Sequence, residues 1–205
     1  MLTVLWSLWG GGVMTGRGYT IFDTGIGRCG IAWGSFGIVG VQLPEAREIE
    51  TRGRMLRQYP DAREMRPPPN VELAIDGIVA LLRGYPCDLS DITLDRSGIH
   101  AFNMRVYEFT RTIPRGETRT YAEVAASLRA SGATHSVAQA ISKNPFMIIV
   151  PCHRVLEAGS YADKISPNGG AISKRRLLSI EGAQAMSSKT LFDVLLPVAP
   201  LRPQG

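Results

Sequence analysis

The sequence predicts an α+β protein, in which a small, strand-rich α/β N-terminal domain precedes a mainly helical C-terminal domain. Short β-rich runs separated by glycines fill the first quarter of the chain, and apolar residues recur at helical spacing in the second half. The 205 residues are 44% hydrophobic, enough to bury one good core or two small ones. We expect domains at 17–94 and 99–183, between a loosely ordered extension at 1–16 and a tail at 184–205.

The N-terminal extension carries an apolar stretch that is too short to span a bilayer, with no basic residue before it. We therefore expect neither a membrane segment nor a secretion signal. Met14 is an alternative start of the protein.

The N-terminal domain is predicted to contain a strand meander and two helices, because glycines separate its β-branched and aromatic runs. A run of three prolines after Arg66 closes the first helix, and Asn70 can cap the second. The expected strands span 19–22, 30–33, 36–42 and 92–95, and the expected helices 45–58 and 70–82.

The C-terminal domain is predicted to hold a helix-turn-helix. A first amphipathic helix covers 102–110, and two shorter helices, 121–128 and 134–142, flank a turn that contains Gly132. The last helix is rich in small side chains, which would let its backbone lie close to a narrow surface such as the minor groove of DNA. Close helix packing inside the core is the alternative.

The positive charge is concentrated in this half. Residues 101–183 hold 11 of the 23 basic and 6 of the 18 acidic residues, which leaves 12 of each elsewhere. Such a local excess favours a polyanionic partner. The three cysteines, at 29, 87 and 152, and the three histidines have no metal-site or disulfide spacing, so we expect no metal and a reducing, cytoplasmic location.

The strongest chemical signal is Pro-Cys-His-Arg-Val at 151–155, directly after the apolar run 146–150. We interpret the run as a buried strand with Cys152 and His153 at its mouth. A cysteine reacts as thiolate, and a neighbouring base is a standard way to generate one. A buried core cysteine beside a solvated histidine is the alternative interpretation.

The flanking motifs, in chain order, connect this pair to a known family. They are Ile-Pro-Arg-Gly-Glu-Thr at 113–118, Thr-Tyr at 120–121, Asn-Pro at 144–145, Gly-Gly at 169–170, Lys174, Leu-Leu at 177–178 and Glu-Gly at 181–182. From about Ile99 to Ala183 the chain resembles the O6-alkylguanine-DNA alkyltransferases, also called methylated-DNA-protein-cysteine methyltransferases.

The resemblance implies direct, irreversible alkyl transfer from O6-alkylguanine in DNA, mainly O6-methylguanine, to Cys152, once per molecule and without a cofactor. It implies that His153 takes the thiol proton through a water and that Glu181 stabilises the imidazolium. Tyr121 would donate to the guanine, and Asn144 would tie the recognition helix to the active site.

The resemblance also implies a monomer that binds double-stranded DNA in the minor groove with the alkylguanine flipped out. The expected contacts are Tyr121, His135, Ser136, Val137, Ala138, Gln139, Arg154, Val155 and Asn168. Two features depart from the family. His135 stands where the family inserts an arginine into the duplex, and the loop 159–168 is about two residues longer, which places Asn168 over the guanine oxygen.

Two other functions compete with this one. An alkyltransferase-like protein would bind damaged bases without chemistry, but that group replaces the nucleophile, and Cys152 is present here. A cysteine enzyme on an unrelated fold is disfavoured because Tyr121, the helix-turn-helix and Glu181 occur in the family's order.

Overall fold

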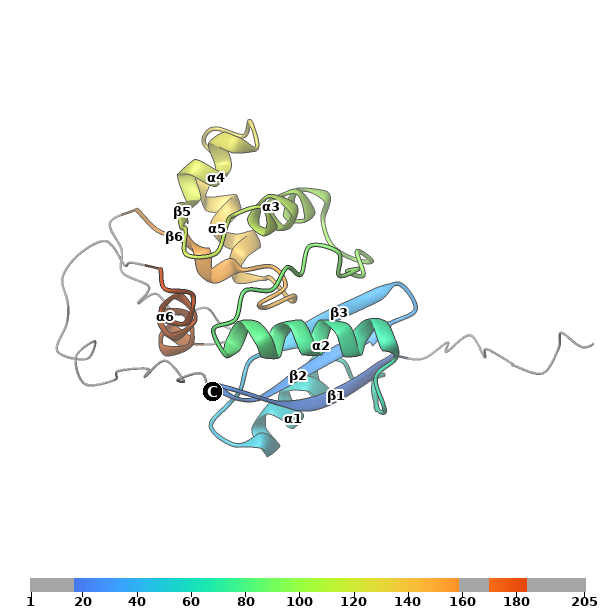
Figure 1. The fold of residues 1–205 in the computed structure, drawn as a ribbon. Helices are drawn as coiled ribbons and strands as arrows, with labels where there is room; N and C mark the ends of the chain where they lie inside the picture. The colour runs from blue at the N-terminus through green and yellow to red at the C-terminus, as the bar shows by residue number, and fades with distance from the viewer. Residues whose placement is uncertain (1–16, 159–169, 184–205) are drawn as a thin grey trace, which may run out of the picture.

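This computed structural model describes residues 17–158 and 170–183 (Figure 1). The expected extension 1–16, the tail 184–205 and the loop 159–168 with Asn168 lie outside the described residues. No helix in the described ranges is long and apolar enough to cross a membrane.

The N-terminal half is built on a four-stranded sheet in the order β3-β2-β1-β4. β1 (Gly18–Thr24), β2 (Gly27–Gly34) and β3 (Gly37–Gln42) form an antiparallel meander, which confirms the prediction. Gly37 begins β3 with φ of 128°, and a Cβ there would lie 2.5 Å from the Thr93 carbonyl oxygen, so only glycine fits. β4 (Arg63–Glu64), which the sequence pattern did not predict, adds a short parallel edge to β1.

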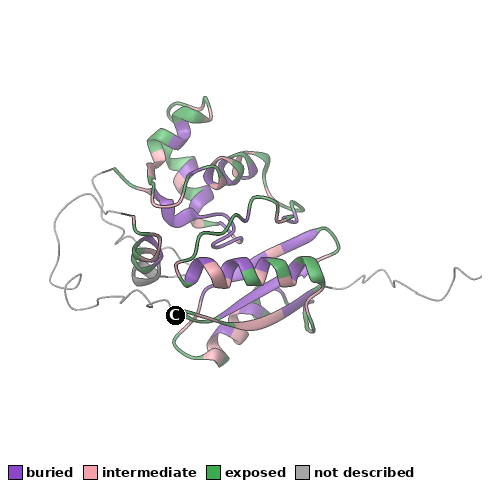
Figure 2. Ribbon diagram, in the orientation of Figure 1, coloured by how far each residue is buried: buried purple, intermediate pink, exposed green. Residues whose placement is uncertain are grey.

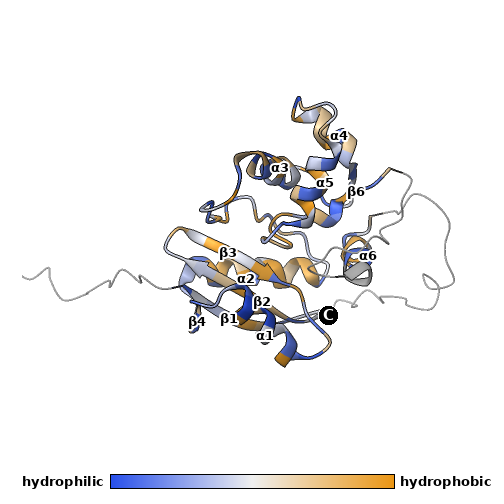
Figure 3. Ribbon diagram, turned by 180° about the vertical axis from the view of Figure 1, so that it is seen from behind, coloured by the Kyte–Doolittle hydropathy of each residue, from blue (hydrophilic) through white to orange (hydrophobic). Residues whose placement is uncertain are grey.

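Two helices cover the two faces of this sheet, as the alternation of side chains along β2 requires. α1 (Glu48–Gln58) buries Met55 against Ala32 on one face. α2 (Pro69–Leu82) buries one side against the other face, where Ile31 lies, and also contacts α6 of the C-terminal half (Figure 1). Figure 3 shows the corresponding contrast, with α1 largely hydrophilic and α2 largely hydrophobic.

Two details of this half differ from the prediction. Asn70 does not cap α2: the helix begins at Pro69, whose fixed φ suits the first helical position, and Asn70 lies inside it. The strand expected at 92–95 is reduced to one bridge, between Leu94 and Ile38.

The C-terminal half contains the predicted helices. They are α3 (Ala101–Arg111), α4 (Tyr121–Ser127) and α5 (Thr134–Ser142), followed by the short 3₁₀ helix η1 (Cys152–Arg154) and by α6 (Gly170–Glu181). Thr120 and Glu123 form a reciprocal capping box that starts α4. β5 (Arg119–Thr120) pairs in parallel with β6 (Val155–Leu156), so the start of α4 is held beside the segment that follows Cys152.

The apolar run 146–150 is a buried turn, so the predicted strand was wrong. Ile148 has φ of 73°, and the Val150 amide donates to the Phe146 carbonyl at 2.7 Å. The Asn144 side chain closes the turn, accepting from the Phe146 amide at 2.9 Å and donating to the Val150 carbonyl at 3.0 Å. These side-chain bonds replace those a strand partner would supply.

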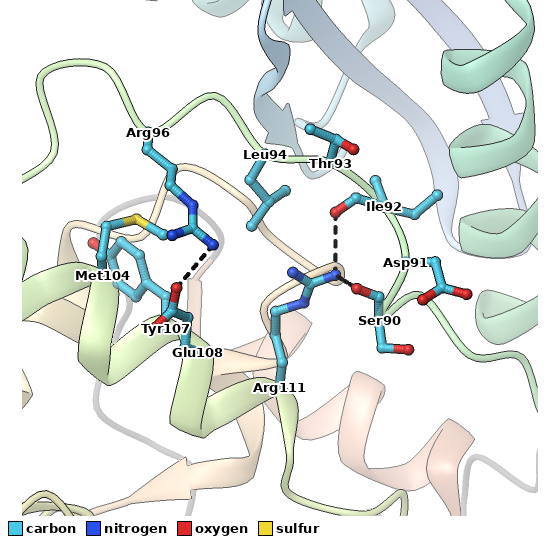
Figure 4. A pocket seen from close by; sticks show the side chains of 10 residues that line it. All are labelled: Ser90, Asp91, Ile92, Thr93, Leu94, Arg96, Met104, Tyr107, Glu108 and Arg111. Atoms are coloured by element: carbon cyan, nitrogen blue, oxygen red, sulfur yellow. Dashed lines mark hydrogen bonds and ion pairs between the residues drawn. The ribbon is translucent and has the colours of Figure 1, made fainter.

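Buried apolar residues from both halves form one contiguous cluster (Figure 2). β3 joins the turn directly, since the Val41 amide donates to the Pro145 carbonyl at 2.8 Å. On α3, Arg111 donates to carbonyls of the linking segment, among them Ile92, beside a cavity of about 230 Å³ (Figure 4). These contacts fix how the two halves meet.

Candidate active site

Cys152 is the first residue of η1 and is only 6% exposed. Burial raises the pKa of its thiol, while a hydrogen bond from Asn144, the charge of Lys174 and nearby backbone amides act in the opposite direction. The net direction is upward, so the resting cysteine is a thiol and needs a base to become a nucleophile.

His153, the next residue, is the candidate for that base, and its ring contacts Glu181. Nε2 of His153 lies 2.8 Å from Oε1 of Glu181, and both side chains are almost fully buried. Burial lowers the pKa of His153, which more than offsets the effect of the Glu181 carboxylate, so the imidazole is neutral at pH 7. We assign the ring proton to Nε2 because that nitrogen faces the carboxylate.

The other ring nitrogen is free to accept a proton. Nδ1 of His153 is buried and has no hydrogen-bond partner in the part of the chain that the structure describes. A buried polar atom of this kind calls for an explanation, and a lone pair held for proton transfer provides one.

Arg154 also binds the Glu181 carboxylate. Its guanidinium donates to Oε2 of Glu181 at 2.9 Å, to Oε1 at 2.7 Å and to the Ile113 carbonyl at 2.6 Å. Burial alone would raise the pKa of Glu181, but the hydrogen bonds from His153 and Arg154 outweigh it and lower the value to about 2. The sequence analysis expected Arg154 among the DNA contacts, whereas the structure places it in the interior.

Asn144 and Tyr121 reach the cysteine from other elements. Asn144, 1% exposed, links the end of α5 to the turn and hydrogen-bonds Cys152. Tyr121 opens α4 and is half-buried; burial raises the pKa of its phenol, and Cys152 adds to the rise. The β5–β6 pairing explains how Tyr121, 31 positions upstream in the chain, comes close to Cys152.

Two further residues belong to the site, and the sequence analysis assigned neither to it. Lys174 of α6 is mostly enclosed, and its Nζ donates to the Val155 carbonyl at 2.7 Å. Tyr107 of α3 donates to the Ala140 carbonyl at 3.0 Å, and its pKa is raised to about 12 by burial and by Cys152. In the sequence, Lys174 stands out only as part of the family's motifs, and Tyr107 only as an apolar position on the helix 102–110.

The outward face of α5 begins with three polar side chains. His135, Ser136 and Gln139 are exposed, and Nε2 of His135 lies 3.1 Å from Nε2 of Gln139. Ala138 is half-buried and Val137 is fully buried, so Val137 packs in the core. In the described residues no cluster of three or more potential metal ligands occurs.

Comparison with known proteins agrees with this geometry. A sequence profile described as "6-O-methylguanine DNA methyltransferase, DNA binding domain" matches residues 101–183. The methylated-DNA-protein-cysteine methyltransferase of Methanothermobacter thermautotrophicus is 35% identical over 153 residues, which is 75% of this chain and 78% of the relative. The enzyme of that name from Mycobacterium tuberculosis H37Rv is 40% identical over 149 residues, 71% of this chain and 87% of its own.

Solved structures show the same similarity over more of the chain. The crystal structure of Mycobacterium tuberculosis O6-methylguanine methyltransferase has a TM-score of 0.65 and 32% identity, covering 86% of this chain and 99% of that one. Mycobacterium tuberculosis OGT in complex with DNA has a TM-score of 0.60 and 30% identity, covering 80% and 91%. With this sequence similarity, this fold and the Cys152–His153–Glu181 arrangement, the chain belongs to the methylated-DNA-protein-cysteine methyltransferase family.

Proposed function

We propose that this protein repairs DNA directly, by transferring the alkyl group of O6-alkylguanine, mainly the methyl group, irreversibly to Cys152. The observation that carries this function is the buried Cys152, followed directly in the chain by a neutral imidazole that hydrogen-bonds a carboxylate. A non-catalytic damage-binding protein is not favoured, because it would have no use for a nucleophile and base in this geometry.

The residues divide the reaction between them. Nδ1 of His153 takes the Cys152 proton through a water, and the resulting imidazolium is stabilised by Glu181, as in other nucleophile-base-acid arrangements. The sulfur then forms a bond to the alkyl carbon while the bond from that carbon to guanine O6 breaks. Tyr121 donates a proton to the departing base, a role that suits a phenol whose raised pKa keeps it protonated.

The buried position of Cys152 supports base extrusion. A base stacked inside a duplex cannot reach a sulfur that is 6% exposed, so the damaged nucleotide has to leave the stack. We infer that double-stranded DNA is engaged through its minor groove, with the exposed side chains of α5, His135, Ser136 and Gln139, against it. The Val155 carbonyl would accept from the extruded guanine, and Asn168 stays a candidate contact.

We propose that residues 99–183 bind DNA and carry out the transfer, while residues 17–94 pack against them and stabilise them. All three cysteines are free, and a reactive thiol persists in a reducing compartment, which supports a cytoplasmic location. Cys152, His153 and Glu181 all come from one chain and one Cys152 completes one reaction, which supports action as a monomer.

The test is intact-mass measurement after incubation with a duplex that carries one O6-methylguanine. We expect one added methyl group per protein, none for Cys152→Ala, and an unchanged adduct for Cys87→Ser, which removes an exposed thiol instead. Binding of the duplex without any adduct at stoichiometric protein would favour the damage-binding alternative and reject the enzymatic one.

A further inference from the structure

The turn between α4 and α5 contains a strained residue. Leu128 ends α4, the Arg129 amide donates to the Ala126 carbonyl and the Ala130 amide to the Ala125 carbonyl, both at 2.9 Å. This pair of bonds is a Schellman motif, and Arg129 occupies its left-handed position with φ of 53°. Glycine normally fills that position because a Cβ makes it unfavourable.

Nothing within the described part of the chain explains an arginine there. Arg129 is exposed, and its guanidinium has no hydrogen bond or ion pair with any residue of 17–158 or 170–183. Strain that the fold itself does not use is characteristic of residues retained for function.

A second cation lies at the same turn. Arg105, exposed on α3, donates from its guanidinium to the Leu128 carbonyl at 2.7 Å, and Leu128 directly precedes Arg129 in the chain. No carboxylate of the described residues pairs with either arginine. Two arginines therefore meet at the turn just before α5, whose own outward face begins with polar side chains other than Lys or Arg.

We propose that Arg129 is a DNA-phosphate contact that seats the helix-turn-helix on the duplex backbone, and that its left-handed conformation is a stability cost kept for this contact. The inference rests on the proposed function, because it takes DNA as the partner. A phosphate contact fixes the orientation of a recognition helix without reading sequence, and guanidinium suits phosphate geometry. Arg129 lies five residues before Thr134, at the start of α5, where such a contact would set the helix against the groove.

Replacing Arg129 by glycine should move stability and DNA affinity in opposite directions. We expect Arg129→Gly to raise Tm by about 2–4 °C, because the left-handed strain is removed. The same variant should bind duplex DNA several-fold more weakly, and the slope of log affinity against log salt should become shallower by about 0.9 for one lost phosphate contact. The reaction with free O6-benzylguanine should be unchanged, since a free base makes no phosphate contact.

Two controls separate charge from backbone. Arg129→Lys keeps the cation and the strain, so it should keep both the wild-type Tm and most of the duplex affinity. Arg57→Gln removes an exposed cation from α1, on the far side of the sheet, and should leave the salt slope unchanged.

The proposal is overturned if Arg129→Gly binds duplex DNA with wild-type affinity and salt slope, or if it lowers Tm, which would mean that the cation stabilises the end of α4. Failure of the wild-type protein to bind duplex DNA at all would instead reject the proposed function.

Discussion

At the scale of single residues, the site pairs a protonated cysteine with a neutral histidine, which we propose as the nucleophile and its base. Burial keeps Cys152 protonated and His153 neutral, so neither group carries charge until a proton moves between them. Glu181 is ionised at pH 7, because the hydrogen bonds from His153 and Arg154 outweigh its burial and keep its pKa low. The carboxylate can therefore stabilise the imidazolium as soon as it forms.

Lys174 should tune the reactivity of Cys152. Its positive charge lowers the pKa of the thiol, so Lys174→Met should move the pH profile of Cys152 alkylation upward and slow the rate at pH 7 about three- to tenfold. Iodoacetamide labelling followed by peptide mass spectrometry would measure this without DNA. Arg175→Met, one residue along on the exposed side of α6, is the matched control, and an equal shift in that variant would show that net charge alone is responsible.

Glu181 should make stability depend on pH in the acid range. Its folded pKa of about 2 lies below the ordinary value of 4.5, so its contribution is complete above pH 4.5 and is lost as pH falls toward 2. Glu181→Gln should cost about 3 kcal/mol of unfolding free energy at pH 7, since it leaves Arg154 buried and uncompensated.

Urea unfolding at pH 7 and pH 3 would measure this difference. The gap between wild type and Glu181→Gln should narrow at pH 3, while Glu117→Gln, which removes an exposed partner of Arg119, should have little effect at either pH. A gap that stays constant would contradict the assignment of the low pKa to Glu181.

At the scale of elements, we expect α5 to influence how readily the damaged base leaves the duplex. Its outward face presents His135, whose imidazole hydrogen-bonds Gln139. Because histidine is shorter than arginine, we expect it to fill the space left by an extruded base less fully. His135→Arg should therefore raise the rate on duplex O6-methylguanine and leave the rate on free O6-benzylguanine nearly unchanged. Extrusion costs a few kcal/mol only when the base starts in the stack.

Single-turnover rates on both substrates would measure the effect. Thr134→Arg adds the same charge at the neighbouring exposed position and should give a smaller increase on the duplex. If both variants accelerate equally, the gain comes from charge. If neither does, His135 is already adequate or does not meet the duplex.

At the scale of the whole molecule, the excess of positive charge lies in the half that holds the site. Outside residues 101–183 the acidic and basic residues balance, so the net charge of +5 belongs to the DNA-binding half. We expect duplex affinity to fall about 3.5-fold per neutralised phosphate for a fourfold rise in salt, and to depend weakly on sequence. Fluorescence anisotropy at several salt concentrations would measure it, and equal affinity at low and high salt would contradict it.

Hydrogen bonds of one arginine connect the two halves next to the site. Arg115 donates to the Gly84 carbonyl at 2.7 Å and to the Ile180 carbonyl at 2.9 Å, which connects the end of α2 to the turn of α6 that precedes Glu181. The N-terminal half thereby contributes to the position of a residue in the active site.

The sequence alone determined the strand meander, the three helices α3, α4 and α5 and the identity of the family, because each depends on local signals. Glycines mark the turns of the meander, apolar spacing marks the helices, and Pro-Cys-His-Arg-Val with its flanking motifs marks the chemistry. The roles of the individual site residues stay predictions.

Only the tertiary structure decided the path of the run 146–150 and the surroundings of the nucleophile. A buried turn and a buried strand have the same apolar composition, and the difference lies in the Asn144 side chain, which supplies the bonds of a missing partner strand. The Arg154 side chain points into the interior because it pairs with Glu181, 27 positions further along the chain. Lys174 reaches the Val155 carbonyl only because of how α6 packs against the segment after Cys152. No short stretch of sequence predicts such contacts, because they form between charged or polar groups that are far apart in the chain and become buried next to each other.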